Sequence, residues 1–584
     1  MAPTSSIRVL EPDNYEWKQL VISSQMVWRR PLLANEAMWL ARSKESRDLF
    51  VYAVLKFEAE TTPKVLSSAA ASAWRQLRFD IPELVLTAGT STKDEKPYLQ
   101  YENPQHESEV DDWVKRTLRI DLRNHDRGFN NMRDKVIKLK RGCTDNVFLF
   151  VRTKNDDYNP GKDGLLQVMI YLDHLVTDGI GARIVLGRYL SLLASSIVTP
   201  INFKLDWQKN HENLSAPWIG LLRNCQELSG PSYEEGVLRN RDIMITRMHD
   251  NHGFPLTLPE TQSQVATGTG FLTFHDWETE PLLEKVKELF NSNSVDVVVG
   301  SNSEDEKVLL KPNITHLGHA AMILALLRFE PLPLPNVPEV PCPVYSPCWF
   351  NGRRYLKPTA SQTDPLTNYI PLCLSFAPIE FPDLRKLSLS ARAEKEEIKT
   401  QLVKACRIAT ERYMNIGKGK DMFSTCVELL EEFGERMRRE LPLIESEQTN
   451  SLEPEVEQTS TDTTDQQDTP PENESSTHSL STPEAIAVDK RDPFFLSDGI
   501  IENFIDRKYF VKSRDAEAKM DEKVLFRVIC VKFTANADRN IIVRMSSWRD
   551  RITLQAEWRK SDYDEIMIKR FLEDIKKIML SILD

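Results

Sequence analysis

A short segment around His174 constrains the fold of this chain more than any other. The apolar run Leu165–Leu172 predicts a strand, and it leads directly into His174-Leu175-Val176-Thr177-Asp178-Gly179. Behind that segment, apolar side chains recur at the i, i+3, i+4, i+7 spacing of an amphipathic helix: Ala182, Val185, Leu186, Tyr189, Leu190 and Leu193. Arg183 and Arg188 fall off this apolar face. The pattern places an HxxxDG sequence at a tight connection between a strand and a helix that packs on a sheet.

The HxxxDG sequence suits one kind of chemistry. A hydroxyl or amine that attacks a thioester must lose its proton, and an imidazole titrates near neutrality, so His174 is a candidate general base. Gly179 would permit the turn or a close approach of substrate. The structural alternative is that Asp178 simply caps the following helix, that Gly179 is an ordinary turn glycine, and that His174 is a structural histidine.

Strands and helices alternate irregularly along the rest of the chain, which predicts an α+β fold. Strands are expected at Leu49–Phe57, Val147–Arg152, Gly270–His275, Val524–Thr534, Ile541–Ser546 and Ile552–Glu557. Helices are expected after the Thr62-Pro63 cap and at Glu280–Phe290, His316–Phe329 and Glu565–Leu583. Prolines interrupt Ile197–Leu258, which we interpret as a crossover between two halves, 1–225 and 226–584. No GxGxxG or GxxxxGK[ST] sequence is present, so nothing supports a phosphate-binding loop.

The net charge of −12 belongs to one tract. Leu441–Val488 holds eleven acidic side chains and no Lys or Arg, which leaves the rest of the chain at about −1. The stretch of about 444–490 is rich in Ser, Thr, Glu and Pro and poor in apolar residues, so we expect a disordered acidic insert in the second half. Without a concentrated basic patch, no nucleic-acid partner is expected.

The eight cysteines form no CxxC pair or regular framework, which favours free thiols in a reducing compartment. The N-terminal residues lack the pattern of a signal peptide, and no apolar run approaches the ~18 residues that span a bilayer. We therefore expect a cytoplasmic protein with no membrane partner, and a monomer.

His316 and His319 have a metal-ligand spacing but no third ligand, so no metal site is expected. These two histidines would line an acceptor pocket or lie on a helix surface.

The HxxxDG sequence with its following helix resembles the chloramphenicol-acetyltransferase-like superfamily, which includes condensation domains. Within it, the chain is most similar to the trichothecene 15-O-acetyltransferase-like enzymes of secondary metabolism. Further stretches that carry the resemblance are Ser346-Pro347, Asn351–Leu356, Pro371–Pro378, His319–Leu327 and Ser546–Trp558. The resemblance covers about residue 40 to the C-terminus. It implies two similar αβ halves with a tunnel between them that reaches His174.

The resemblance also implies roles for individual residues. His174 would be the general base, and Asp178 would hold the loop through an ion pair with Arg353 or Arg354, of which strand alternation lets only one face inward. Condensation domains carry a second histidine where this chain has Asp173, which argues against peptide-bond formation. The plant-type enzymes carry a DFGWG segment that is absent here, and Ser497-Asp498-Gly499 lies in roughly its place as a candidate active-site loop.

The leading prediction is an O-acyltransferase that moves an acyl group, acetyl by preference, from CoA to a hydroxyl of a natural-product intermediate. Acyl-CoA would be a co-substrate, with no permanently bound cofactor. Two alternatives stay open: the same fold with a diverted proton-transfer or cyclisation step, and a non-catalytic binding protein on the same scaffold. Pocket shape decides which hydroxylated small molecule is accepted, and residues far apart in the chain form that pocket.

Overall fold

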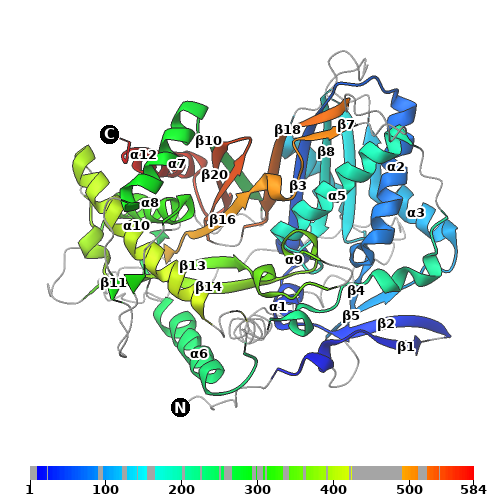
Figure 1. Ribbon diagram of the computed structural model, residues 1–584, viewed down its shortest axis with the longest axis horizontal. Helices are drawn as coiled ribbons and strands as arrows, with labels where there is room; N and C mark the ends of the chain where they lie inside the picture. The colour runs from blue at the N-terminus through cyan, green and yellow to red at the C-terminus, as the bar shows by residue number, and fades with distance from the viewer. Residues whose placement is uncertain are drawn as a thin grey trace, which may run out of the picture.

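In the computed structural model, the chain folds into two αβ halves that lie beside each other (Figure 1). The structure describes residues 10–583, with gaps at 23, 90–96, 122–127, 141–142, 154–164, 200–203, 224–226, 249–250, 256–265, 292–296, 299–306, 309–311, 333–340, 360–362, 390–391, 420–422, 424–489, 511–522 and 538–539. The predicted acidic insert at about 444–490 therefore lies outside the described residues, except for Lys490 at its end.

The first half is built on a six-stranded sheet with the order β17-β18-β3-β8-β7-β6. Its strands are β3 (Asp48–Phe57), β6 (Leu118–Asp121), β7 (Val147–Thr153), β8 (Leu165–Asp173), β17 (Lys508–Phe510) and β18 (Val524–Ala535). All pairings are antiparallel except that of β6 with β7. The strand predicted to lead into His174 is thus β8, near the centre of the sheet, where both faces are buried.

Helices cover both faces of this sheet. One face packs on α2 (Pro63–Asp80), α3 (Glu107–Thr117) and α5 (Gly179–Val198), and the other packs on α4 (Phe129–Lys140). The Thr62 hydroxyl accepts a hydrogen bond from the Val65 amide and Pro63 fills the first turn of α2, as the sequence predicted. Figure 1 shows α5 in front of the strands, with α2 and α3 beside it on the right.

A smaller sheet with the order β1-β2-β5-β4 lies below the first half. Its strands are β1 (Lys18–Ile22), β2 (Gln25–Pro31), β4 (Thr87–Gly89) and β5 (Tyr98–Glu102). The short helix α1 (Ala34–Leu40) follows β2 directly and is buried almost throughout. None of these elements was predicted from the sequence.

The second half is built on the sheet β10-β20-β19-β16 and the hairpin β13-β14. The strands are β10 (Thr267–Thr273), β13 (Val344–Asn351), β14 (Leu374–Phe381), β16 (Phe494–Ile500), β19 (Ile542–Trp548) and β20 (Arg551–Arg559). The helices are α6 (Pro231–Arg241), α7 (Asp276–Asn291), α8 (Ile314–Phe329), α9 (Pro365–Asn368), α10 (Lys395–Lys418) and α12 (Glu565–Leu580). Helices α8, α10 and α12 supply much of the largest hydrophobic core.

The division of the chain at residue 225 needs correction. Strands β17 and β18 come from the expected second unit, 226–584, yet they pair beside β3 in the sheet of the first half. The alternating apolar pattern of β18 gives β3 an antiparallel neighbour and closes an edge that would otherwise be open. The two halves are therefore linked by a strand exchange, visible in Figure 1 as the late-sequence strand β18 beside the early-sequence strand β3.

Helix α5 is more deeply buried than an amphipathic surface helix. Arg183, which was expected on the exposed face, is only 1% exposed, because Asp498 of β16 and the Phe533 ring of β18 lie against it. By length and composition α5 is also apolar enough to cross a membrane, contrary to the expectation that no segment approaches that length. About 67% of its apolar window is buried inside the protein, so we interpret α5 as a core helix.

Candidate active site

His174 lies at the junction of the two halves, directly after β8. Its amide donates a 2.7 Å hydrogen bond to the carbonyl of Arg47, the residue directly before β3. The preceding Asp173 pairs across the sheet with Asp48, so the sheet fixes the backbone up to the imidazole. The side chain is 6% exposed. The structure therefore holds this histidine at a strand end, as the motif predicted, with little contact with bulk solvent.

The imidazole of His174 stacks on the indole of Trp39 from α1. The ring centroids are 3.7 Å apart and the planes differ by 16°. The guanidinium of Arg42 lies over the same indole, 4.6 Å from its centroid. Sequence reasoning missed Trp39, because α1 is too short for a recognisable periodicity and its partner lies far along the chain.

Burial sets the charge of His174. It lowers the pKa of the imidazole to about 4, against an ordinary value of 6.5, although the Asp178 carboxylate raises it. The guanidiniums of Arg42 and Arg544 lower the pKa further. The ring is thus neutral at physiological pH, which is the state in which a general base accepts a proton.

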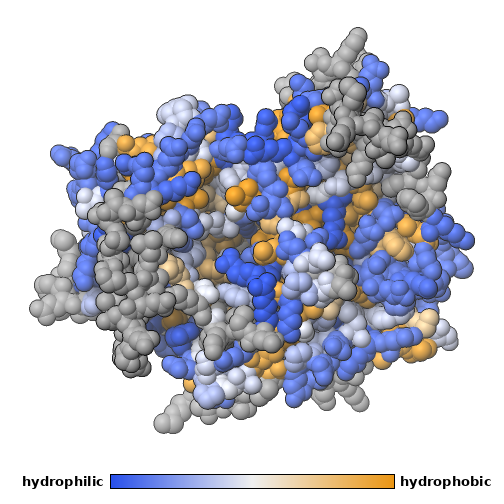
Figure 2. Space-filling view, viewed as in Figure 1, coloured by the Kyte–Doolittle hydropathy of each residue, from blue (hydrophilic) through white to orange (hydrophobic). Residues whose placement is uncertain are grey.

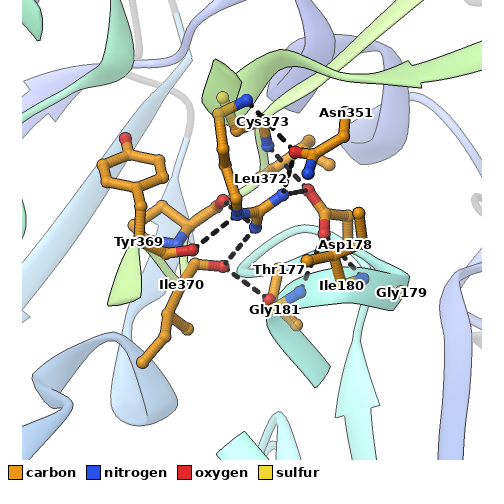
Figure 3. A network of polar contacts seen from close by, with 12 residues as sticks. Thr177, Asp178, Gly179, Ile180, Gly181, Asn351, Tyr369, Ile370, Leu372 and Cys373 are labelled. Atoms are coloured by element: carbon orange, nitrogen blue, oxygen red, sulfur yellow. Dashed lines mark hydrogen bonds and ion pairs between the residues drawn. The ribbon is translucent and has the colours of Figure 1, made fainter. Parts of the chain in front are cut away.

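Asp178 makes the structural contacts that the motif suggested. Its Oδ1 accepts hydrogen bonds from the amides of Ile180 (3.0 Å) and Gly181 (2.9 Å), which caps α5. Its Oδ2 accepts from Arg353 Nη1 and from the Cys373 amide, each at 2.8 Å (Figure 3). Burial would raise the pKa of this carboxyl, but Arg353 and the amides hold it below its ordinary value.

Arg353 is the arginine that pairs with Asp178, and Arg354 is exposed. The reason differs from the expected strand alternation: the two arginines lie in a 3-10 helix, Gly352–Tyr355, after β13. The Arg353 guanidinium also donates to the carbonyls of Tyr369 (2.6 Å) and Pro371 (3.0 Å). Because the same guanidinium binds Asp178, Arg353 ties the second half to the start of α5; Figure 3 shows Asp178 and Tyr369 within this network.

The glycines of the motif region allow close packing and not a special backbone conformation. A Cβ on Gly179 would lie 2.9 Å from the Phe533 ring. A Cβ on Gly181 would lie 2.1 Å from Thr177 Oγ1 and 2.2 Å from the Ile370 carbonyl oxygen. The motif helix therefore begins where a loop from the second half presses against it.

Asp173, the residue before the motif, is buried and paired. Its carboxylate lies 3.3 Å from Arg47 Nη2, and it accepts a hydrogen bond from the Leu175 amide at 2.9 Å. This carboxylate stabilises the turn that carries His174.

The segment Ser497-Asp498-Gly499 lies in β16 at a bulge in its parallel pairing with β19. Asp498 is the member that contacts the first half: its Oδ2 lies 2.5 Å from Arg183 Nη2 on α5, and its Oδ1 lies 3.3 Å from Arg544 Nη1 on β19. Arg544 in turn pairs with the buried Glu557 at 3.0 Å. Ser497 is exposed and shares a hydrogen bond with Thr315.

This chain of charges corrects the expectation that Arg183, which falls off the apolar face of the helix, points to solvent. Its positive charge is instead balanced by Asp498 inside the protein. Both Arg183 and Arg544 lie over the Phe533 ring, at 4.4 Å and 4.9 Å from its centroid.

His316 and His319 lie inside the second half and not on a helix surface. His319 is bonded to Ser346 Oγ (2.8 Å) and Tyr413 Oη (3.0 Å), and His316 Nδ1 lies 3.1 Å from Thr410 Oγ1. Burial lowers the pKa of His319 to about 3. No group of three or more metal-binding side chains occurs within the described part of the chain.

The cleft lined by Arg188, Asn368 and Tyr509 has a volume of about 340 Å³ and lies against α5 away from His174. It is not a route to the imidazole, so the tunnel between the halves stays a prediction. Figure 2 shows a largely hydrophilic surface on which hydrophobic residues also gather near the middle, where the two halves meet.

Two αβ halves that meet at a buried, neutral HxxxDG histidine define an acyltransferase of the chloramphenicol-acetyltransferase-like class. The family model described as 15-O-acetyltransferase Tri3 matches residues 7–425. The chain therefore belongs to the Tri3 acetyltransferase family, and the acyltransferase predicted from its sequence is confirmed.

Similar proteins cover almost the whole chain. The trichothecene O-acetyltransferase TRI3 of Trichoderma arundinaceum is 23% identical over 98% of this chain and 97% of its own length. The trichothecene 15-O-acetyltransferase TRI3 of Fusarium sporotrichioides is 23% identical over 99% and 98%. The solved structure of that Fusarium protein covers 99% of both chains with a TM-score of 0.76 at 20% identity.

A more distant likeness concerns the fold alone. The starter condensation domain of rhizomide synthetase, solved with C8-CoA and Leu-SNAC, covers 95% of each chain with a TM-score of 0.53 at 8% identity. The predicted α+β class with two similar halves is thereby confirmed.

Proposed function

We propose that the protein transfers an acetyl group from acetyl-CoA to a hydroxyl of a trichothecene-type natural product, with His174 as general base. The observation that carries the proposal is the state of His174: buried, neutral at physiological pH and fixed at the junction of the halves. The names of its relatives support the acetyl group and the class of acceptor.

The reaction needs only one proton to move through the enzyme. His174 Nδ1 is fully buried without a side-chain partner among the described residues, and the imidazole interacts with the backbone of its own residue. Nε2 is therefore the nitrogen that faces the acceptor in this mechanism. Nε2 takes the hydroxyl proton while that oxygen attacks the thioester carbonyl carbon. The tetrahedral intermediate then collapses, the C–S bond breaks, and the imidazolium returns the proton to the CoA thiolate.

Asp178 has no part in that proton transfer. Both of its oxygens accept hydrogen bonds from α5, Arg353 and Cys373, and its ion pair with Arg353 keeps it ionised. Its role is to hold the loop that follows the general base. His174 is thus a general base without a carboxylate partner, unlike the histidine of a serine-protease triad.

The test compares the parent protein with His174→Ala and with His275→Ala, a matched change at an exposed histidine. The substrates are acetyl-CoA and a trichothecene with a free 15-hydroxyl. Loss of the base should lower kcat by about 100- to 10,000-fold, and the His275 variant should match the parent. A folded His174→Ala protein with parental turnover would refute the mechanism.

Omission of acetyl-CoA separates acyl transfer from the diverted reaction. If the proposal holds, no product forms from the acceptor without the thioester, and one free thiol appears per ester formed. An acceptor that is converted without thioester would point to cyclisation. Membership of the Tri3 family favours acyl transfer.

We also propose that the protein works as a cytoplasmic monomer. In support, the cysteines in the described part of the chain are all free thiols: Cys143, Cys342, Cys348, Cys373, Cys406 and Cys530. Size-exclusion chromatography with light scattering tests the monomer, and fractionation of the source cells tests the compartment.

A further inference from the structure

No side chain among the described residues forms a hydrogen bond with His174 Nδ1, and the imidazole interacts only with the backbone of its own residue. Asp178 is fully committed to α5 and Arg353. The backbone is fixed by the hydrogen bond from the His174 amide to Arg47, but that bond does not restrain rotation of the side chain. The parallel indole of Trp39, at 3.7 Å, restrains the ring plane.

Helix α1 presents Trp39 from a rigid support. Glu36 forms two hydrogen bonds with the Arg30 guanidinium, at 2.7 Å and 2.6 Å, and both side chains are buried. The same carboxylate accepts a 2.8 Å bond from the Leu33 amide at the start of the helix. Met38 and Trp39 also pack with Leu372 from the second half. The indole is therefore held from the strand before α1 and from the opposite half.

We propose that Trp39 is a positioning residue for the reaction: its indole fixes the plane of the His174 ring so that Nε2 faces the acceptor hydroxyl. The inference rests on the proposed function of His174. The Arg42 guanidinium also lies over the same indole, 4.6 Å from its centroid, and adds a cation–π contact that stabilises the position of Trp39. An aromatic face thus replaces the carboxylate that orients the histidine in a triad.

The first test separates the flat ring from its apolar volume. Trp39→Leu keeps an apolar side chain but removes the aromatic face, and Trp39→Phe keeps a face. Trp277→Leu is the control, because Trp277 also stacks on a histidine, His275, at 5.4 Å but is 73% exposed. Trp39→Leu should lower kcat by about 10- to 100-fold with KM for acetyl-CoA nearly unchanged. Trp39→Phe should recover most of kcat.

A second readout does not depend on any substrate. Diethyl pyrocarbonate modifies neutral imidazoles, and mass spectrometry of the peptide that contains His174 gives the rate. Trp39→Leu should raise this rate at least about tenfold over the parent, since the ring is released from its stack, while Trp39→Phe and Trp277→Leu leave it near the parental rate. The two proposals can fail separately. If Trp39→Leu raises the modification rate of His174 but the parent protein transfers no acyl group, the proposed function is refuted, whereas the orienting role of the Trp39 stack is supported.

Two results would overturn the positioning role. One is a Trp39→Leu protein with parental kcat and a parental modification rate. The other is an equal loss of kcat in Trp39→Leu and Trp39→Phe, which would mean that the size of the indole matters and its aromatic face does not. Circular dichroism confirms that each variant is folded before either readout is taken.

Discussion

Arg353 and Asp178 form an ion pair of 2.8 Å in which neither side chain is exposed to solvent. The carboxylate belongs to the start of α5 in the first half, and the guanidinium belongs to the 3-10 helix after β13 in the second. The aspartate of HxxxDG thus joins the two halves beside His174. The role of Asp178 is structural, because its ion pair with Arg353 fixes the segment that follows His174.

Asp178→Asn should destabilise the fold strongly. The change keeps the shape but removes the charge, which leaves Arg353 buried without a counter-ion, and such a loss costs about 3–5 kcal/mol. Arg354→Ala is the control: it removes a neighbouring exposed arginine and should change the free energy of unfolding by less than about 0.5 kcal/mol. Urea unfolding measures both. Equal stabilities for Asp178→Asn and the parent would contradict the structural role.

The pH dependence of turnover should reflect the buried state of His174. The imidazole must be neutral to act as a base, and burial lowers its pKa to about 4, so kcat/KM should stay level from about pH 8 to about pH 5 and fall only below that. If the imidazole had its ordinary pKa of 6.5, kcat/KM would already fall to half at about pH 6.5. A profile of kcat/KM against pH distinguishes the two pKa values, and circular dichroism at each pH excludes unfolding. An inflection between pH 6 and 7 would show that the ring is solvated.

The same shift affects stability. The pKa of His174 is lower in the folded state than in the unfolded chain, so the unfolded state binds more protons between about pH 6.5 and pH 4. The contribution of the neutral, buried ring to stability is therefore complete above about pH 6.5 and declines as the pH falls towards 4.

The sequence predicted those parts of the site that depend on local patterns. The strand before His174, the cap at Asp178 and the helix behind it follow from an apolar run, a capping residue and a 3.6-residue period. The predicted strands Ile541–Ser546 and Ile552–Glu557 pair as neighbours, and in the turn between them Arg549 and Asp550 adopt positive φ angles of 52° and 62°.

The missed features depend on contacts between distant segments. Arg183 was expected in solvent because its neutralising partner, Asp498, lies 315 residues further along the chain. Trp39 gave no signal, since its stacking partner His174 follows a strand much later in the chain. Strand β18 was predicted correctly as a strand but assigned to the wrong half, because a strand's own sequence does not specify which neighbour it pairs with.

Gly181→Ala should damage the site through packing alone. The added methyl group would lie 2.2 Å from the Ile370 carbonyl oxygen, which cannot move without disturbing the nearby loop that Arg353 binds. Overpacking of this kind costs about 1–3 kcal/mol. Gly417→Ala is the matched control in α10, where nothing lies within 4 Å, and there alanine should stabilise the helix by about 0.5–1 kcal/mol. Thermal unfolding shows whether each change raises or lowers stability. An unchanged stability in Gly181→Ala would contradict the close approach of Ile370 to Gly181.

Asp498→Asn should weaken the second connection between the halves. Asp498 is the shared counter-ion of Arg183 on α5 and Arg544 on β19, and both guanidiniums are nearly buried. Without its charge, Arg183 loses the acidic group that forms a salt bridge with it in the described part of the chain, whereas Arg544 keeps Glu557. We therefore expect a loss of about 3–5 kcal/mol in the free energy of unfolding, and Ser497→Ala, an exposed change at the preceding residue, should cost less than about 1 kcal/mol.

The double variant Arg183→Met/Asp498→Asn tests whether Asp498 stabilises the protein through its ion pair with Arg183. Removing both charges of a buried pair costs less than removing one, because no unpaired ion remains, so the double variant should recover part of the stability lost in Asp498→Asn. Urea unfolding of the four proteins in this cycle gives the coupling energy between the two side chains. If the two losses simply add, Arg183 and Asp498 do not stabilise each other, and the contact between α5 and β16 must depend on the packing of Phe533 between the two arginines.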